Sequence, residues 1–224
     1  MRMLKKILGK PFDNFLLILQ PPKIELTAVL QELLGSTLLL ADMGCGEGSH
    51  LKMVKRRVNS HWIGVDLHQP SLEAAKSRGI YDATHCDGII DWLRQQPTSS
   101  IDTVLASCVI EHLDKTDGFE LIKEMKRVSS RQAIVFTPNG FVPQPGSLDN
   151  PANAHRSGWE VQELEELGFE VKIGLYGFKK LRTSFGLPSI NPQIFGDLIA
   201  KSTSRFVFHR PKFAYQIVGV FKKN

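Results

Sequence analysis

The most constraining feature of this sequence is the segment LLLADMGCGEG, residues 38–48, in which an apolar run ends in an acid and three glycines follow at every second position. Gly44, Gly46 and Gly48 allow the backbone to turn sharply and to approach a ligand closely. Where such a loop leads from a strand into a helix, the free amides at the helix start point toward whatever is bound. The segment therefore predicts a nucleotide-type pocket at the end of the first strand.

The spacing of this loop argues against a pyrophosphate ligand. The dinucleotide pattern G-x-G-x-x-G requires a glycine where Ser49 stands, and the Gly-Lys-Ser/Thr of a P-loop does not follow. Asp42 precedes the first glycine, where its carboxylate would repel a phosphate but could orient an amine-bearing ligand. These residues favour a ligand with a charged amino-acid end over a dinucleotide.

From residue 37 onward, short apolar runs alternate with helical patterns, as in a mostly parallel sheet covered by helices on both faces. The seven predicted strands are residues 37–43, 62–66, 80–84, 101–107, 132–137, 169–175 and 215–221. The predicted helices are residues 49–58, 70–77, 88–95 and 117–128, and a fifth that begins at SGWE and ends before Gly168. In SGWE, Ser157 and Glu160 have the spacing of a capping box. The expected fold class is therefore α/β.

We expect a single domain, because 224 residues with 42% apolar composition suit one core. Residues 1–36 are a predicted N-terminal helical segment, residues 37–175 the core, and residues 213–224 the last strand. Residues 176–212 break the alternation with three prolines and contain one predicted helix, residues 193–201. Such a long irregular stretch predicts a lid or a surface-binding insertion.

The net charge of +5 is distributed unevenly along the chain. Residues 1–23 carry five basic residues and one acid, and residues 176–224 carry nine and one, so the two ends contribute +12 and residues 24–175 contribute −7. The basic ends also contain interleaved apolar and aromatic residues. They suit contact with an anionic or lipid-linked acceptor, a membrane surface or nucleic acid, and equally an ordinary lid with solvated lysines.

Cysteine usage and hydropathy bear on the compartment. Cys45, Cys86 and Cys108 are odd in number and show no C-x-x-C spacing, so the sequence predicts neither a disulfide framework nor a metal site. No apolar run approaches the roughly 20 residues of a membrane span, and a secretory signal is not expected. We therefore expect a cytoplasmic protein, with association at a membrane surface as the alternative.

Two further acids follow predicted strands. Asp66 ends HWIGVD, a position at which an acid commonly accepts both hydroxyls of a ribose, and its alternative role is that of an exposed loop acid. Asp87 in HCDG begins a helix, where a carboxylate either caps the helix or accepts a hydrogen bond from an adenine amino group. Both acids are thus candidates for contact with a nucleoside.

Taken together, these residues resemble the class I, Rossmann-like, S-adenosylmethionine-dependent methyltransferases. ADMGCGEGSHL looks like the first motif of that family, IGVDLHQPSLEAAKSRG like its ribose-binding strand and helix, CDG like its adenine-side motif, and IDTVLASCVIEHL like the strand that lines the cofactor pocket. ELIKEMKRVSSRQAIVFTPN matches the next helix and fifth strand. The resemblance implies a seven-stranded sheet whose antiparallel last strand is inserted between the fifth and the sixth.

The resemblance also implies which residues hold S-adenosylmethionine. Asp42 would orient the methionine moiety through its amine, and Asp66 would hold the ribose. The other implied cofactor residues are the loop residues Gly44, Cys45, Gly46 and Gly48, the adenine-side residues Leu67, Cys86, Asp87 and Gly88, and Ser107, Cys108 and Val109 near the sulfonium.

A sulfonium methyl group is already activated, so such an enzyme aligns donor and acceptor and, for a hydroxyl acceptor, provides a base. The candidate bases are His112 in IEHL and His155 in NAHRSGW. His112 follows the fourth strand on the side where parallel sheets bind ligands, although an E-H pair can also simply open a helix. Residues 138–158 form a long loop expected to face the acceptor, with Arg156 and Trp159 as further candidate contacts and helix packing as the alternative for Trp159.

The expected function is methyl transfer from S-adenosylmethionine to a small-molecule or lipid- or glycan-linked acceptor. Oxygen methylation is favoured, because the N-P-P-Y or D-P-P-Y signature of amino-group methylation is absent from the sequence. Nucleic acid is not the expected partner. The alternatives are an RNA methyltransferase, a nicotinamide-dependent oxidoreductase, and a binding module that retains the cofactor site without catalysis.

Overall fold

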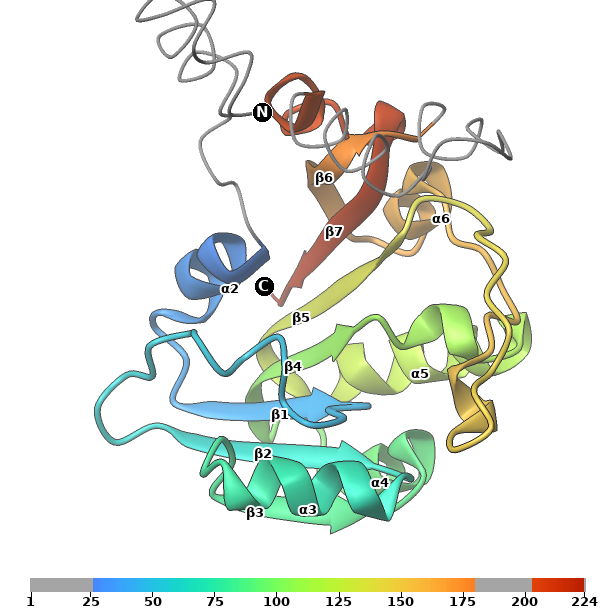
Figure 1. Cartoon of the computed structure of the whole chain (residues 1–224). Helices are drawn as coiled ribbons and strands as arrows, with labels where there is room; N and C mark the ends of the chain where they lie inside the picture. Colours follow the sequence, from blue (N-terminus) through green and yellow to red (C-terminus); the bar gives the residue numbers. More distant parts are fainter. Residues whose placement is uncertain (1–25, 180–202, 224) are drawn as a thin grey trace, which may run out of the picture.

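The computed structural model describes residues 26–179 and 203–223, and its centre is one sheet with the strand order β3-β2-β1-β4-β5-β7-β6 (Figure 1). The strands are β1 (Leu39–Met43), β2 (His61–Asp66), β3 (Ala83–Cys86), β4 (Ile101–Ser107), β5 (Ser129–Pro138), β6 (Glu170–Phe178) and β7 (Ala214–Lys222). Strands β1 to β5 pair in parallel, whereas β7 lies antiparallel between β5 and β6. The predicted topology is confirmed.

Helices cover both faces of the sheet. They are α2 (Leu26–Leu34), α3 (Gln69–Ser77), α4 (Ile89–Arg94), α5 (Lys115–Val128) and α6 (Val161–Glu166), with 3-10 turns η1 (Ile110–His112), η2 (Pro151–Asn153) and η3 (Pro211–Phe213). Because side chains alternate along a strand, each central strand contributes to two separate cores. In β5, Ala133 and Val135 pack with α4, α5 and α6, whereas Ile134 and Phe136 pack with α2 and α3.

The helix predicted for residues 49–58 does not form. The chain turns once after the glycine loop, with the amides of Leu51 and Lys52 donating to the Gly48 carbonyl, and then continues as an irregular loop. The side chain of Arg56 binds this loop, because it donates a hydrogen bond to the Ser60 carbonyl at 3.0 Å and also contacts Asp82. These long-range contacts hold an extended path that local helix propensity does not reveal.

Two element boundaries differ from the predicted ones for identifiable reasons. The capping box lies one turn later than SGWE, because Glu160 is the N-cap residue and pairs with Glu163, while the Ser157 hydroxyl donates to the Ile110 carbonyl. The third strand begins at Ala83 and not at residue 80, because the side chain of Asp82, 2.7 Å from the Trp62 amide, accepts the hydrogen bond there.

The predicted lid segment is described only in part. Strand β6 extends to Phe178, three residues beyond the predicted end of the core, and residues 203–207 are helical. The predicted helix at 193–201 and the basic segment at the N-terminus lie outside the described residues. Among the helices of 26–179 and 203–223, none has the length and apolar character needed to cross a membrane.

Candidate functional site

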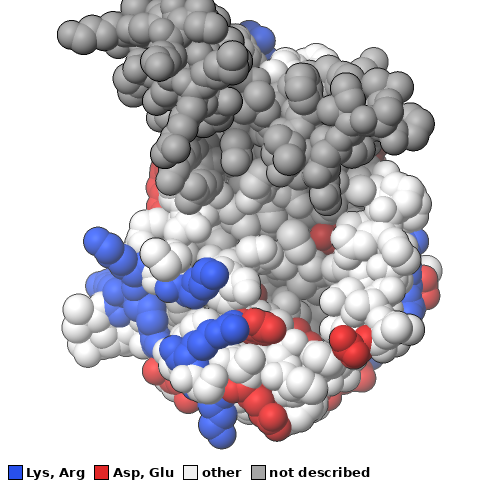
Figure 2. Space-filling model, in the orientation of Figure 1, with Lys and Arg blue, Asp and Glu red and all other residues white. Residues whose placement is uncertain are grey.

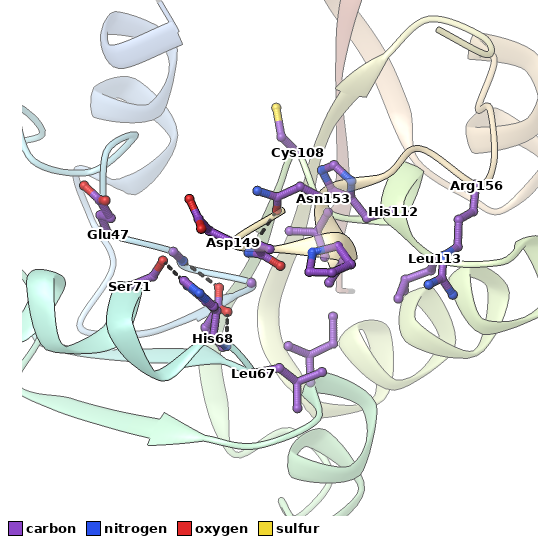
Figure 3. A pocket seen from close by; sticks show the side chains of 18 residues that line it. Glu47, Leu67, His68, Ser71, Cys108, His112, Leu113, Asp149, Asn153 and Arg156 are labelled. Carbon is purple, nitrogen blue, oxygen red and sulfur yellow. Dashed lines mark hydrogen bonds between the residues drawn. The ribbon is translucent and has the colours of Figure 1, made fainter. Parts of the chain in front are cut away.

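A cavity of about 690 Å³ opens at the carboxyl ends of β1, β2 and β4, the position at which open parallel sheets bind ligands (Figure 3). Its wall comes from the glycine loop, the turn after β2, the segment after β4 and the loop that contains η2. The lining residues are Gly44, Gly46, Glu47, Asp66, Leu67, His68, Ser71, Ile89, Cys108, Val109, His112, Leu113, Asp149, Asn150, Pro151, Ala152, Asn153 and Arg156.

The three loop glycines have positive φ angles, which glycine adopts without steric cost. Close packing adds a second reason at two of them. A Cβ on Gly44 would lie 2.6 Å from a methyl carbon of Val109, and a Cβ on Gly48, which is not on the wall, would lie 2.5 Å from Ile80. A Cβ on Gly46, which lines the cavity, would meet no atom of the described residues within 4 Å. The loop is therefore bare at Gly46, where a ligand has room to approach the backbone.

Asp66 is the last residue of β2, and its carboxylate forms hydrogen bonds with two different parts of the wall. Its Oδ2 accepts a hydrogen bond from the Gly46 amide at 2.7 Å, and its Oδ1 accepts one from the His68 amide at 2.8 Å. The His68 ring in turn lies 2.7 Å from the Ser71 hydroxyl in the first turn of α3. Each carboxylate oxygen of Asp66 retains a further lone pair, so this side chain can still accept the two hydroxyls of a ribose.

Asp42 lies beneath the glycine loop and not on the cavity wall. Its side chain is buried, and Oδ2 accepts a hydrogen bond from the Tyr81 hydroxyl at 2.6 Å. Burial raises the pKa of the Asp42 carboxyl to about 7, against the lowering effect of the Tyr81 hydrogen bond. Asp42 thus reaches a ligand only through the loop above it or through water, and its role in orienting an amine stays a prediction.

Only some of the residues predicted to bracket an adenine line the cavity. Leu67 lines the cavity together with Ile89 of α4, which the sequence analysis missed. Cys86 lies outside this cavity, with its thiol 3.5 Å from the Leu67 carbonyl oxygen. The Asp87 carboxylate accepts a hydrogen bond from the Gly88 amide at 2.7 Å, immediately before α4. Asp87 and Gly88 therefore shape the start of the helix that carries Ile89.

Of the residues predicted to bind the cofactor at the end of β4, some line the cavity and one lies behind its wall. Cys108 and Val109 line the cavity, and Cys108 has a φ of 57°, an uncommon conformation for a residue other than glycine. Ser107 is buried behind them, with its Oγ 2.8 Å from Nδ1 of His50. Cys45 is likewise buried under the glycine loop. Ser107 and Cys45 support the wall without forming part of it.

The two histidines proposed as bases lie side by side, although they are far apart in the sequence. The ring centroids of His112 and His155 are 4.8 Å apart, with the rings inclined at 68°. His112 stands on the cavity wall, whereas His155 lies behind it. Burial lowers the pKa of His112 below its usual value. The structure thus brings together two residues that the sequence analysis could only name separately.

Glu111, beside them, is the most deeply buried acid of this region. It is 2% exposed, and its Oε2 accepts a hydrogen bond from the Thr137 hydroxyl at 2.9 Å. Burial raises the pKa of the Glu111 carboxyl to about 7. Within the described part of the chain, Glu111 forms no ion pair with a lysine or an arginine.

The loop that carries His155 is attached firmly to the turn after β4. The amides of Arg156 and Ser157 donate to the Glu111 carbonyl at 2.8 and 3.1 Å. Trp159 is fully buried, and its Nε1 donates to the Ile110 carbonyl at 3.2 Å. Trp159 is therefore a packing residue that holds the loop, the alternative that the sequence analysis left open.

Several wall residues were not predicted. They are Glu47, His68, Ser71, Ile89 and Leu113. His68 and Ser71 directly follow Asp66 in LHQPS, so their proximity to the ligand could have been inferred from the helix start. Residues 149–153 of the η2 loop line the cavity within the segment 138–158 that was expected to face the acceptor, but none of these five was named individually, because the position of the loop depends on contacts with the distant β4 turn.

Comparison with known proteins agrees with this geometry. A family model described as a methyltransferase domain matches residues 40–132. Over 93 residues, the chain is 39% identical to a protein of Bos taurus named probable tRNA methyltransferase 9B; the match covers 40% of this chain but only 18% of that protein.

Two solved structures show the same fold at low sequence identity. A SAM-dependent methyltransferase from Archaeoglobus fulgidus is 21% identical, with a TM-score of 0.57 over 88% of this chain and 92% of that chain. Magnesium protoporphyrin IX methyltransferase from Synechocystis, solved with bound SAH, is 14% identical, with a TM-score of 0.52 over 100% of this chain and 99% of that chain.

The sheet order, the glycine loop and the ribose-side acid define a Rossmann-like methyltransferase domain of class I. Residues 40–132 match the model of a methyltransferase domain, and the fold is the Rossmann-like fold of class I methyltransferases.

The cavity fits the cofactor of this family. Gly46 leaves the space that a Cβ would fill, so the methionine portion can lie against the loop backbone. Asp66 has lone pairs free for the ribose hydroxyls, and Leu67 and Ile89 supply apolar surface for an adenine. The match with a methyltransferase domain, together with the missing third glycine, leaves no support for the nicotinamide alternative.

Proposed function

We propose that this chain transfers a methyl group from S-adenosylmethionine to an oxygen atom of a small-molecule or lipid- or glycan-linked acceptor. The observation that carries the proposal is the continuity of the cavity, which runs from Asp66 at the cofactor side to His112 and Arg156. A single space of about 690 Å³ that joins the two sides allows a donor and an acceptor to be aligned.

The roles of the chain's own residues follow from this arrangement. The cofactor supplies a methyl group already activated on a sulfonium sulfur. Asp66 and the backbone at Gly46 would fix the nucleoside and methionine portions, while Cys108 and Val109 would limit movement near the reacting carbon. His112 would act on the acceptor, because it lies across the cavity from His68, and His155 would support it from behind the wall, where the two rings are 4.8 Å apart (Figure 3).

The charges around the cavity favour a small acceptor over a polyanion. The wall carries the acids Glu47, Asp66 and Asp149, against Arg156 as its one arginine or lysine within the described residues. Lysines and arginines gather on another part of the surface, visible at the lower left in Figure 2, where acidic side chains also lie. The basic ends that would contact an anionic membrane or acceptor lie mainly outside the described residues.

RNA is the second candidate acceptor, because of the curated relatives that carry the name probable tRNA methyltransferase 9B. A tRNA acceptor would have to engage basic residues that neutralise phosphates, and its binding would weaken steeply with salt. The two candidates therefore differ in a property that is simple to measure.

The test is a methyl-transfer assay with radiolabelled cofactor, offered in parallel to total tRNA and to protein-free small-molecule and lipid extracts. The proposal predicts label in an extract fraction, as a product that survives at high salt and is lost in Asp66→Ala. Label in tRNA alone, with transfer suppressed by salt, would establish the RNA candidate in its place.

A further inference from the structure

The structure assigns a divalent metal site to Glu111, His112 and His155, for a transition-metal ion such as Zn²⁺, Mn²⁺ or Fe²⁺. One ligand atom from each of these residues lies within 4.8 Å of the other two. Metal-bound donor atoms at about 2.0–2.2 Å from an ion lie roughly 3–3.5 Å apart, so the most widely spaced pair of ligand atoms would need to close by at most roughly 1.3–1.8 Å. The inference rests on the proposed function only for the identity of the acceptor, because metal binding itself requires no methyl transfer.

Both histidine rings have one nitrogen beside a backbone carbonyl oxygen. Nδ1 of His112 lies 3.2 Å from the carbonyl oxygen of Ala154, and Nδ1 of His155 lies 2.6 Å from that of Val142. A carbonyl oxygen can only accept, so each Nδ1 carries the proton and each neutral ring keeps the lone pair on Nε2. A ligating histidine typically donates its other ring N–H to a carbonyl in this way, which fixes both tautomer and orientation.

Glu111 adds a buried carboxylate that has neutral hydrogen-bond partners. Its Oε2 accepts from Thr137, and the thiol of Cys108 also bonds to this carboxylate. Burying a charged carboxylate without a cation is costly, and a divalent ion would compensate that charge directly. Two imidazoles and one carboxylate form the donor set of many catalytic transition-metal sites, whereas Ca²⁺ and Mg²⁺ prefer oxygen donors alone.

Hydrogen bonds hold the segment that carries His155 against the turn that carries Glu111 and His112. Amides of residues 156 and 157 donate to the carbonyl of Glu111 itself, and the Ser157 hydroxyl donates to Ile110 at 3.0 Å. The chain therefore fixes His155 against the turn that carries the other two groups. Such preorganisation lowers the conformational cost of gathering three ligands around one ion.

One of the three residues of the cluster, His112, lines the cavity. His112 stands on the wall beside Asn153 and Cys108, across the cavity from His68 (Figure 3). With three protein ligands, an ion retains open positions at which a substrate oxygen can bind. A hydroxyl bound there would lose its proton to solvent more readily, and the electron pair left on oxygen would attack the methyl carbon. The bond from that carbon to the sulfonium sulfur would break at the same time, with its electron pair going to sulfur, so that S-adenosylhomocysteine is the leaving group. The metal would thus select for acceptors that bear an oxygen next to the transferred group.

The test is the binding of Co²⁺ and Zn²⁺ to the full chain without an affinity tag, followed by calorimetry and, for Co²⁺, by visible absorption. We expect one ion per chain and a Co²⁺ absorption spectrum typical of mixed nitrogen and oxygen ligands. His155→Ala and Glu111→Gln should each weaken binding by at least about tenfold. His61→Ala, which removes an exposed histidine outside the cluster, should bind as the wild type does.

Titration of the same samples with S-adenosylmethionine separates this inference from the proposed function. His155→Ala that still binds the cofactor but has lost Co²⁺ would support the metal site and show that the variant is folded. Wild-type protein that binds cofactor without binding Co²⁺ or Zn²⁺, or His155→Ala with wild-type metal affinity, would overturn the metal site and leave the methyltransferase proposal intact. Failure of the wild type to bind cofactor would instead count against the proposed function.

Discussion

At the scale of single residues, the glycines after β1 have different tasks although they look alike in the sequence. Gly44 and Gly48 are required by packing, because added Cβ atoms would collide with Val109 and Ile80. Gly46 has open space instead, and its amide is bound by Asp66. Gly44 and Gly48 are thus needed for close packing of the loop, whereas Gly46 exposes backbone to the ligand.

This difference predicts that alanine at position 46 mainly weakens cofactor binding, whereas alanine at position 48 mainly lowers the stability of the fold. Gly46→Ala should weaken S-adenosylmethionine binding by about tenfold or more, because the methyl group enters the cavity, with a loss of stability near the roughly 1 kcal/mol of a left-handed alanine. Gly48→Ala should lose about 1–3 kcal/mol more in unfolding free energy, because of the contact with Ile80. Calorimetric affinities and chemical denaturation of both variants provide the measurement, and equal effects on both properties would contradict the assignment.

Asp42 predicts a pH dependence of stability. Its pKa is about 7 in the folded protein against 3.8 for an ordinary aspartate, so the folded state binds this proton more tightly than the unfolded state does. The contribution is complete below about pH 4 and is lost as the pH rises to about 7, so that unfolding free energy falls across this window. Asp42→Asn removes the titration.

Denaturant unfolding at several pH values checks this expectation. The difference in unfolding free energy between Asp42→Asn and the wild type should grow in favour of the variant from pH 4 to pH 7. Asp91→Asn, an exposed acid of α4, serves as the control and should show no such trend. A difference that stays constant over this range would show that Asp42 does not titrate as its burial implies.

At the scale of elements, the site depends on how the loop after β5 is attached to α5 and to the turn after β4. Trp159 is the link, because its ring packs against Gly118 of α5 and its Nε1 bonds to Ile110. The ammonium of Lys115 also lies 3.5 Å from the centre of a Trp159 ring. Helix α5, the loop after β5 and the turn after β4 are therefore joined through the buried indole of Trp159.

Gly118→Ala tests this attachment. Alanine normally stabilises a helix interior by about 1 kcal/mol relative to glycine. Here the added Cβ would lie 2.4 Å from Cζ2 of Trp159, so we expect a net loss of about 1–3 kcal/mol in unfolding free energy. Denaturant unfolding measures the change, with Lys123→Ala on the exposed face of α5 as a near-neutral control. Stabilisation by Gly118→Ala would mean that the Trp159 contact is looser than described.

The elements also show how far local sequence signals reach. The alternation of apolar runs predicted all seven strands, because buried strands have a strong and repeated pattern. The place of the last strand between the fifth and the sixth was implied by the resemblance to class I methyltransferases. The helix predicted at 49–58 was wrong, because Arg56 finds its partners in Ser60 and Asp82 and not along a helix. Cofactor-side wall residues such as Gly46 and Asp66 follow motifs, whereas Glu111 and His155 come together only through tertiary contacts that no spacing encodes.

At the scale of the whole molecule, the two halves of the sheet contribute different parts of the cavity wall. Strands β1 to β4 and their loops build the cofactor side of the cavity, while the loop that follows β5 closes its acceptor side. β7 and β6 extend the sheet beyond that loop and lead to residues 180–202, outside the described part of the chain. The loop after β5 lies beyond residues 40–132, so the match with the methyltransferase domain does not include this part of the wall.

The central claim is that this cavity binds S-adenosylmethionine through Asp66. Isothermal titration calorimetry of the full chain with S-adenosylmethionine and with S-adenosylhomocysteine measures this directly. The account predicts saturable binding of both at one site, at least about tenfold weaker in Asp66→Ala, where the loss of hydrogen bonds to the ribose and to Gly46 weakens the site, and unchanged in Asp91→Ala. Absence of binding in the folded wild-type chain, or wild-type affinity in Asp66→Ala, would contradict it.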